Sequence, residues 1–471
     1  WVSRSMYSPI EAGTPLTEPL IDNSLFGRRG TSDTRRTLAA TGTLSLAIFG
    51  SSVVPMPYAF SLTGVGLGCV TAVAAAALNG YTSALLVRAA AKRGGTSAPA
   101  TYEELAREVG GRGFELAVQG ALLVLLFGTL TSNLAAISEA VGDALVIHEH
   151  GGGKGTGTGM EMETAESGVD GLLLSGGGWF AGAVGLRRVV SLGIVLAVVL
   201  PLCMLRRMHL LETVSASGLP LLLTLLGFVV WKAAEAGFPG AAGGSSTWVW
   251  RPLSLDLAEA FALLGFALYV QPMLLPMLGE LHERLVTEER MSAEAALPRA
   301  AAILERAVLL TIFLALVFYC LLGSFGFLWK GLGETPQDIL QGFSSPGGHA
   351  LAIVMACYIA CCYVPMYHSL RVTLEQLMGG REGGFAVRAG RAVLVVGSTV
   401  LVAIIIPRSE SLFAITGAVG VGLVCYVFPA TIYIRQRPRP RLAWRTLAGA
   451  ALGGGTLLSI AALVSALART A

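Results

Sequence analysis

The sequence predicts an all-α polytopic membrane protein with eleven transmembrane helices, and three observations carry this prediction. Charged residues make up only 13% of the 471 residues, whereas a soluble globular domain has about 25%. Long stretches of the chain contain no charge, and a helix needs about 20 apolar residues to cross a bilayer core. The segments that join these stretches alternate between rich and poor in positive charge. No soluble fold explains this combination.

The uncharged runs place the individual spans. The stretch between Arg36 and Arg88 is long enough for spans 1 and 2 with a tight turn between them. Several later runs are shorter than 20 residues, so flanking residues must extend their ends to the membrane surface. Spans 3 to 11 correspond, in order, to Leu116–Ser138, Val189–Leu205, Thr213–Trp231, Phe261–Gly279, Ala307–Trp329, Ala350–Tyr367, Ala392–Pro407, Ser411–Ile434 and Thr446–Ala468.

Positive charge predicts the orientation of these spans. With eleven spans, 25 of the 33 Lys and Arg residues fall on the side of the N-terminus. Because Lys and Arg accumulate on the cytoplasmic side of membrane proteins, the N-terminus is expected inside and the C-terminus outside or in a lumen. The formal net charge is only +3, so we expect no nucleic-acid partner.

The chain divides into four predicted parts. Residues 1–36 form a polar tail, expected to be cytoplasmic and disordered. Residues 37–237 and 238–434 each contain five spans, and residues 435–471 contain a basic loop and the eleventh helix. Within the first half, the outer loop 148–187 has low complexity and is also expected to be disordered.

Two of the spans carry unusual interruptions. Span 1 contains GSSVVPMPYAF (Gly50–Phe60), and span 6 contains YVQPMLLPM (Tyr269–Met277). Each proline removes a helical hydrogen bond and costs about 3 kcal/mol in a helix interior. Backbone groups freed at membrane depth persist only where protein, water or a ligand satisfies them. Both spans are therefore predicted to be broken helices.

The position of these breaks suggests a binding site. Spans 1 and 6 begin the two groups of five and cross in opposite directions, which predicts a five-plus-five inverted repeat with one extra C-terminal helix. Matching breaks in two inverted halves indicate the central site of a transporter. Exposed amides of a half-helix suit a carboxylate, and freed carbonyls suit an ammonium group. For one span alone, a proline kink that improves packing is the better interpretation; the matched pair favours a site for a zwitterion.

The spans contain few groups for other chemistry. No Asp, Glu, Lys or Arg lies in the middle of a span, where a charge is costly and usually functional. A pocket without a fixed charge favours neutral amino acids. An intramembrane enzyme would need clustered His, Asp or Glu, so we expect no catalytic residues, no metal and no cofactor.

Five segments resemble the amino acid/auxin permease family, which includes sodium-coupled, proton-coupled and vacuolar amino acid transporters. The resemblance extends from Thr37 to Ile434, and its segments occur in the family's order and spacing. The segments are GSSVVPMPYAFSLTGVGLG in span 1, TYEELAREVGG after span 2, VLPLCMLRRMHLLETVSASG across spans 4 and 5, QPMLLPMLGEL in span 6 and FAITGAVGVGLVCYVFPATIYI in span 10.

The resemblance implies an APC-superfamily-like fold with eleven spans, a cytoplasmic N-terminus and transport by alternating access. It also implies a set of substrate contacts, carried over residue by residue. The implied contacts are Ile48, Phe49, Gly50, Ser51 and Ser52 in span 1, Phe266, Tyr269 and Gln271 in span 6, and, as second-tier positions, Asn133 in span 3 with Cys357 and Tyr358 in span 8.

The chain departs from the sodium-coupled branch of this family at three positions. Leu46 stands near the place of an asparagine that helps to bind sodium, and Cys357 lies where a hydroxyl is used. A hard cation needs oxygen ligands, which neither side chain offers. Gln271 replaces a histidine that is common before the span 6 proline. The resemblance therefore favours proton coupling, or exchange without a coupling ion, over sodium coupling.

Two alternatives remain open at this stage. The chain could be an amino-acid-binding membrane sensor that signals through its N-terminal tail, or a transporter of another small organic acid. The expected partners are the amino acid substrate and the lipid bilayer, with no obligate protein partner. The expected location is the plasma membrane or a vacuolar or endolysosomal membrane.

Overall fold

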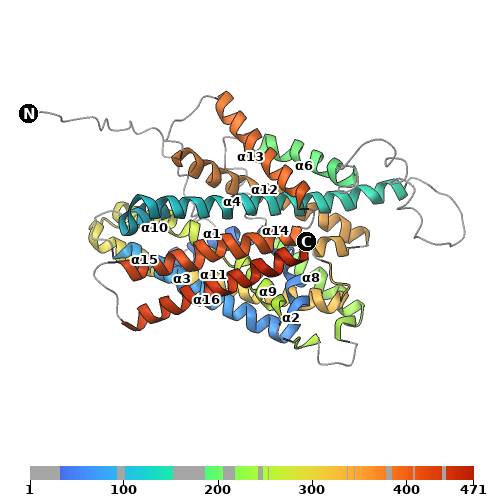
Figure 1. The fold of residues 1–471 in the computed structure, drawn as a ribbon, viewed down its shortest axis with the longest axis horizontal. Helices are drawn as coiled ribbons and strands as arrows, with labels where there is room; N and C mark the ends of the chain where they lie inside the picture. Colours follow the sequence, from blue (N-terminus) through green and yellow to red (C-terminus); the bar gives the residue numbers. More distant parts are fainter. Residues whose placement is uncertain are drawn as a thin grey trace, which may run out of the picture.

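The computed structural model is almost entirely helical, and most of its helices run along one long axis (Figure 1). It describes residues 32–92, 101–151, 186–204, 218–241, 248–252, 254–331, 333–336, 338–343, 345–377, 385–406, 409–436 and 442–470. The expected tail 1–36 therefore lies mostly outside the described residues, as does most of the loop 148–187. The described part of that tail, residues 32–36, is helical, because the first helix begins at Ser32.

The first half of the chain contains the following helices in order. They are α1 (Ser32–Ile48), η1 (Ser51–Val53), α2 (Met56–Thr63), α3 (Val65–Ala91), α4 (Tyr102–Gly151), α6 (Leu186–Met204), α8 (Gly218–Glu235) and η2 (Pro239–Ala241). Within α4, Gly111 has a φ of +74°, a left-handed conformation that favours glycine. The residue separates a short helix from the long membrane helix that follows.

The second half contains a similar series. Its elements are α9 (Leu255–Ala267), α10 (Gln271–Glu288), α11 (Ala293–Lys330), η4 (Ile339–Gly342), α12 (Pro346–Leu377), α13 (Phe385–Ile405), α14 (Ser409–Thr416), η5 (Gly417–Val427), α15 (Phe428–Arg435) and α16 (Leu442–Thr470). The segment η5 is a π-helix of 11 residues. Such helices are rare and usually much shorter, and no residue pattern predicted one here.

Helix length and composition agree with the predicted fold class. Among the described residues, eight segments are long and apolar enough to cross a membrane, and two shorter apolar helices lie at Leu192–Cys203 and Ala389–Ile405. The broken first span, α1 with α2, is not among them. The prediction of an all-α polytopic membrane protein is confirmed. The number of eleven spans and the inverted repeat stay predictions.

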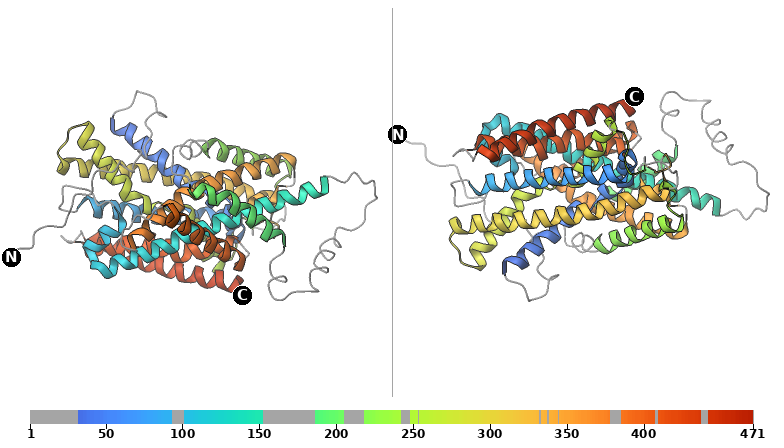
Figure 2. Two further views of the ribbon diagram at one scale, coloured as in Figure 1. Left: turned by 90° about the horizontal axis from the view of Figure 1, so that it is seen from above. Right: turned by 90° about the horizontal axis from the view of Figure 1, so that it is seen from below.

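Two groups of helices build the core. The helices α1, α2, α3 and α9 pack around α11 or one another, and α4 packs along α12, α6, α13 and η5. Figure 2 shows the long α11 running beside α3 through the length of the molecule. Small side chains allow this close approach, which is the usual basis of helix packing in lipid. In α3 they include the buried Ala72, Ala75 and Ala76.

A candidate site at two broken helices

The first span is broken where the sequence predicts. Helix α1 ends at Ile48, Phe49 and Gly50 form a bend, and α2 starts only at Met56. Pro57 occupies the first turn of α2, a position where the missing N–H costs nothing because that group has no helical partner. The proline pair therefore starts a second half-helix instead of kinking a continuous one.

The sixth span is broken in the same way. Helix α9 ends at Ala267 and α10 begins at Gln271, with Pro272 in its first turn. The second proline, Pro276, lies inside α10 without ending it. The two breaks are neighbours, because η1 and α2 both contact α9. The arrangement required for a shared site is therefore present.

Three side chains satisfy the carbonyl groups that the first break frees. The Tyr358 hydroxyl donates to the Phe49 carbonyl at 2.6 Å, and the Tyr319 hydroxyl donates to the Ile48 carbonyl at 3.3 Å. Ser52 Oγ lies 3.0 Å from the Ile48 carbonyl and 3.0 Å from the Tyr319 hydroxyl. The Ile48 carbonyl also accepts from the Gly50 amide at 2.9 Å and has no capacity left. A carbonyl has two lone pairs, so the Phe49 carbonyl leaves room for a second donor such as a substrate ammonium group.

The position of Tyr358 depends on a glycine in α8. A Cβ atom added at Gly218 would lie 2.5 Å from the Tyr358 ring, which no real contact allows. Because Gly218 has no side chain, the tyrosine ring can lie against α8 while its hydroxyl reaches the break in span 1. This close approach connects three spans at the candidate site.

Aromatic residues of the second break divide into buried and accessible ones. Phe266 is fully buried, with ring centroids 5.5 Å from Tyr269 and 5.4 Å from Phe413. Tyr269 is only partly buried. Its hydroxyl lies 3.5 Å from Thr129 Oγ1 and 4.0 Å from Met366 Sδ. Helices α4 and α12 therefore frame this side of the break.

An open space adjoins the first break. A Cβ atom built at Gly50 would meet no other atom within 4 Å, and Gly50 itself is only partly buried. Phe49, by contrast, is core: its ring packs edge-on against Phe318 at 5.1 Å and Tyr319 at 5.7 Å between centroids. The backbone at Gly50 is thus an accessible part of the break.

The other sequence-predicted site residues differ in burial. Ile48 and Ser52 are buried in the first break, and Asn133 is buried on α4. Cys357 is exposed on α12, whereas Tyr358 next to it points into the site. The side chains of Leu46 and Ser51 lie outside the described residues.

Sequence reasoning did not find all the residues at the site. Tyr319, Thr129 and Met366 were not predicted, although Tyr319 is fully buried between the two aromatic rings and the break. Each lies in an apolar run without a local motif. A tyrosine within such a run is the weak signal that could have pointed to Tyr319.

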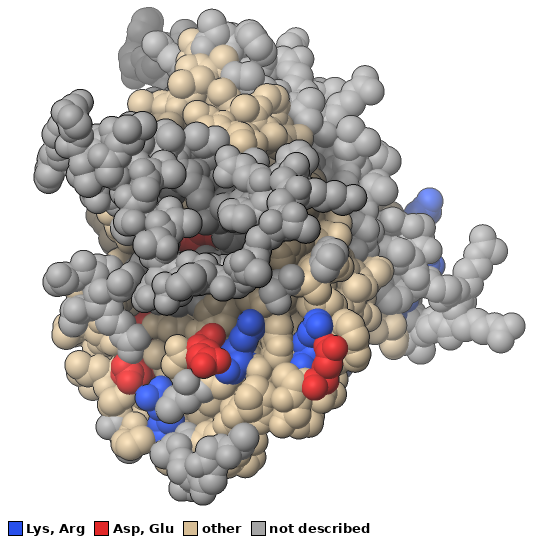
Figure 3. Space-filling model, turned by 90° about the vertical axis from the view of Figure 1, so that its right-hand side faces the viewer, with Lys and Arg blue, Asp and Glu red and all other residues tan. Residues whose placement is uncertain are grey.

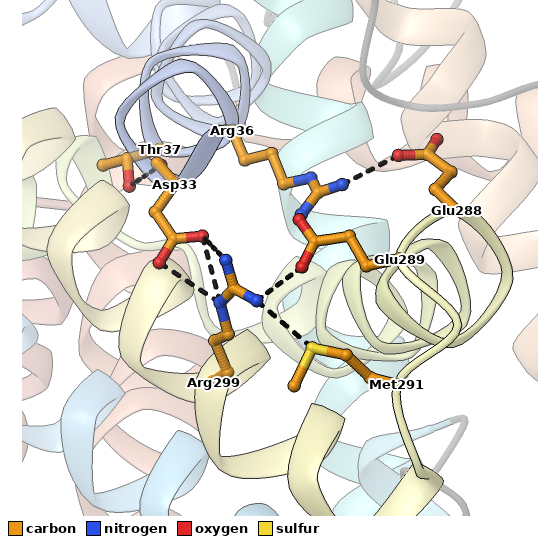
Figure 4. Close-up of polar contacts among 7 residues, drawn as sticks. All are labelled: Asp33, Arg36, Thr37, Glu288, Glu289, Met291 and Arg299. Atoms are coloured by element: carbon orange, nitrogen blue, oxygen red, sulfur yellow. Dashed lines mark hydrogen bonds and ion pairs between the residues drawn. The ribbon is translucent and has the colours of Figure 1, made fainter. Parts of the chain in front are cut away.

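An ion-pair network joins α1, α10 and α11 at one end of the molecule (Figure 4). Arg36 of α1 binds Glu288 at 2.8 Å and also Glu289, which caps the end of α10. Arg299 of α11 binds Asp33 of α1 at 2.7 Å and also Glu289. The network therefore ties α1 and α10, the halves of the two broken spans that lie at this end, to α11.

The opposite end also carries paired charges. Seen from that end, several of the described Lys and Arg side chains lie beside Asp or Glu (Figure 3). Lys232 and Glu235 form one such pair at 2.7 Å within α8. A pocket of about 230 Å³ lies at the ends of α8 and α11. Its lining consists of Phe228, Lys232, Glu235, Ala236, Trp329, Lys330, Phe343 and Ser345, and it includes no residue of either break.

Among the described residues, no three or more His, Cys, Asp or Glu side chains lie together in a way that could hold a metal ion. All seven cysteines are free thiols.

Comparison with known proteins identifies the family. The model of the family described as transmembrane amino acid transporter protein matches residues 33–452. The chain belongs to this family. Its resemblance to amino acid permeases, predicted from five segments, is confirmed, and transport of amino acids across a membrane is the activity of the family. The chain is accordingly an integral membrane protein.

A sequence relative agrees with this assignment, and two solved structures resemble the fold. The chain is 24% identical to the amino acid transporter AVT6C of Arabidopsis thaliana over 418 residues, which cover 83% of this chain and 84% of the relative. The crystal structure of MhsT in complex with L-phenylalanine has a TM-score of 0.51 at 12% identity, covering 93% of this chain and all of that one. A manganese transporter of Eremococcus coleocola, solved with an aromatic bis-isothiourea compound, gives 0.49 at 12% identity, covering 95% and 90%. The likeness to MhsT shows a shared fold.

Proposed function

We propose that this transmembrane amino acid transporter carries neutral amino acids by alternating access, with transport linked to protons. The observation that supports this most is the pair of neighbouring breaks with open space beside Gly50. The second break contributes the partly exposed aromatic ring of Tyr269, and the first break contributes backbone groups. A zwitterion with an uncharged side chain suits such surroundings.

The site chemistry supports a neutral side chain for the substrate. The described side chains at the breaks are hydroxyls, aromatic rings, an amide and a thioether. A fully charged substrate side chain would leave an uncompensated charge at membrane depth, which costs several kcal/mol. The structural neighbour MhsT holds L-phenylalanine, so aromatic as well as aliphatic neutral amino acids belong in the test panel.

The preference for protons over sodium rests on missing ligands. Cys357 occupies the span 8 position of a hydroxyl and is exposed, and Leu46 occupies the span 1 position of an asparagine. A sodium ion bound there would lack oxygen ligands. We further propose that the N-terminus is cytoplasmic, in line with the positive-inside rule, in a plasma or vacuolar-type membrane.

Uptake into proteoliposomes tests this proposal. Purified protein is reconstituted, and uptake of labelled amino acids is measured with an inward proton gradient, an inward sodium gradient, or neither. We expect accumulation of neutral amino acids that depends on the proton gradient. Uptake of lysine or glutamate should be much weaker.

Three results would contradict the proposal. Accumulation driven by sodium alone would overturn the proton linkage, and preference for cationic or anionic amino acids would overturn the assigned class. Binding of amino acids without any uptake, in vesicles shown to be tight, would favour a sensor instead.

A further inference from the structure

A chain of buried polar side chains connects the break in span 6 with spans 2 and 10. Gln271 Nε2 lies 3.3 Å from Asn79 Oδ1 and 3.3 Å from Thr82 Oγ1 of α3. Asn79 Nδ2 in turn donates to the Tyr426 hydroxyl at 3.1 Å. Gln271, Asn79 and Thr82 are completely buried and Tyr426 nearly so. Polar groups at this depth are expensive unless they are fully paired.

The pairing defines one orientation for both amides. Gln271 Oε1 accepts from the Val270 backbone amide at 2.9 Å, so its NH₂ group must face α3. The second N–H of Asn79 donates to the Ala75 carbonyl at 3.0 Å, which leaves Asn79 Oδ1 as the acceptor for Gln271. Turning either amide over would place two donors or two acceptors together. The network therefore has a single satisfied arrangement.

Gln271 also caps the half-helix on which it lies. The N-cap position of α10 is Val270, whose side chain cannot accept a hydrogen bond. Pro272 has no N–H, and the Met273 amide donates to the Val270 carbonyl at 3.0 Å. The Gln271 side chain accepts from the Val270 amide, as the Glu or Gln of a capping box does for the N-cap amide. The start of α10 is thus held by a residue that is itself held by α3.

The far end of the network lies in an irregular segment. Tyr426 is in the last turn of the π-helix η5, which packs against α3, α4, α9 and α16. π-Helical turns within α-helices are frequent at functional sites. Here the segment brings the Tyr426 hydroxyl to Asn79, so that span 10 contacts the break in span 6 through two side chains.

We propose that Asn79 and Tyr426 are positioning residues of the substrate site: they fix the Gln271 side chain and, through it, the start of α10 at the break in span 6. In this arrangement the Gln271 side chain serves the protein and does not contact substrate. Substrate binding depends on the three side chains because they set where the half-helix begins. This inference rests on the proposed transport function only for its effect on substrate.

Tyr426→Phe is the sharpest test, since it removes one oxygen and keeps the ring. Amide hydrogen exchange of a peptide containing Val270, measured by mass spectrometry without substrate, should become about fivefold faster. The KM for the best neutral amino acid should rise about fivefold, with kcat changed less than twofold. Gln271→Leu should give larger changes in the same direction.

Tyr102→Phe is the matched control. The Tyr102 hydroxyl is also buried and also binds η5, at the Val424 carbonyl, 2.9 Å away, but it is not part of the network. Tyr102→Phe should lower the melting temperature about as much as Tyr426→Phe does, while the exchange rate of the Val270 amide and the KM stay at wild-type values. An equal KM shift in both variants would mean that the network contributes only to general packing, and it would overturn the proposal.

The exchange measurement separates this proposal from the proposed function. If the wild type transports no amino acid, the transport proposal fails, whereas Val270 exchange still tests whether Tyr426 holds the break. Unchanged exchange in folded Tyr426→Phe protein would overturn the network's role. Faster exchange with unchanged KM would overturn its role in positioning substrate.

Discussion

At the scale of single residues, the break in span 1 is maintained by tyrosine hydroxyls from distant helices. Tyr358 and Tyr319 donate to the Phe49 and Ile48 carbonyls, groups that a continuous helix would have paired internally. Without the Tyr358 hydroxyl the Phe49 carbonyl would be unsatisfied at membrane depth, which costs several kcal/mol. The Ile48 carbonyl also accepts from the Gly50 amide and Ser52. The hydroxyls therefore allow the helix to be broken before any substrate arrives.

The substitution Tyr358→Phe tests this role. Removing the hydroxyl leaves the Phe49 carbonyl with one donor fewer, so the break should lose its defined shape. We expect the KM for a neutral amino acid to rise about tenfold, equivalent to about 1.4 kcal/mol, in proteoliposome uptake. Tyr363→Phe is the control, because Tyr363 is buried on the same helix but binds Thr399. A KM shift of the same size in the control would contradict the assignment.

A second substitution, Gly50→Ala, tests the open space. The added methyl group meets no atom within 4 Å, so thermal stability should stay within about 0.5 kcal/mol of the wild type. Substrate binding should nevertheless weaken at least about tenfold, because the methyl group occupies space meant for the ligand. Gly279→Ala in α10 also meets no atom and should leave binding intact. Wild-type affinity in Gly50→Ala, measured by equilibrium binding, would place the substrate elsewhere.

At the scale of elements, ion pairs decide how the half-helices are held at one end. Helix α11 has 38 residues, about 57 Å at 1.5 Å per residue, against a bilayer core of about 30 Å. Its first turns therefore stand outside the hydrocarbon, where Arg299 can pair with Asp33 and Glu289. By joining α1, α10 and α11, these pairs hold the three helices together at this end.

Reversing one charge should weaken the contact between these helices. Arg299→Asp places three carboxylates together and is expected to lower the rate of uptake about tenfold, since repulsion opens this end. The double variant Asp33→Arg with Arg299→Asp restores an opposite pair and should recover at least half of the lost rate. Lys232→Gln, which breaks a pair inside α8 alone, is the control. If the double variant takes up substrate no faster than Arg299→Asp, the ion pair does not hold these helices in the arrangement that transport needs.

At the scale of the whole molecule, composition and proline positions predicted the fold class and the two breaks, whereas the side-chain contacts between distant helices could not be predicted. The breaks at Gly50 and before Gln271 follow from local chemistry, because Gly and Pro act on their own stretch of backbone. Tyr319 and Tyr426 could not be predicted, since their partners lie 267 and 347 positions away in the sequence. The π-helix η5 has no local signal either. Its glycine-rich sequence fits an ordinary packed span equally well.

The arrangement of the chain ends offers a last test. In both views of Figure 2, α1 begins toward the left-hand side of the helices and α16 ends toward the right-hand side, as expected for an odd number of spans. We expect an N-terminal tag to be reached by protease only from the cytoplasmic side of sealed cells or vesicles. A tag after α16 should be reached only from the other side. Because inserting or losing one span would place both tags on the same side, that result would rule out eleven spans. The positive-inside count would then need a different set of membrane segments, starting with the shorter helices α6 and α13.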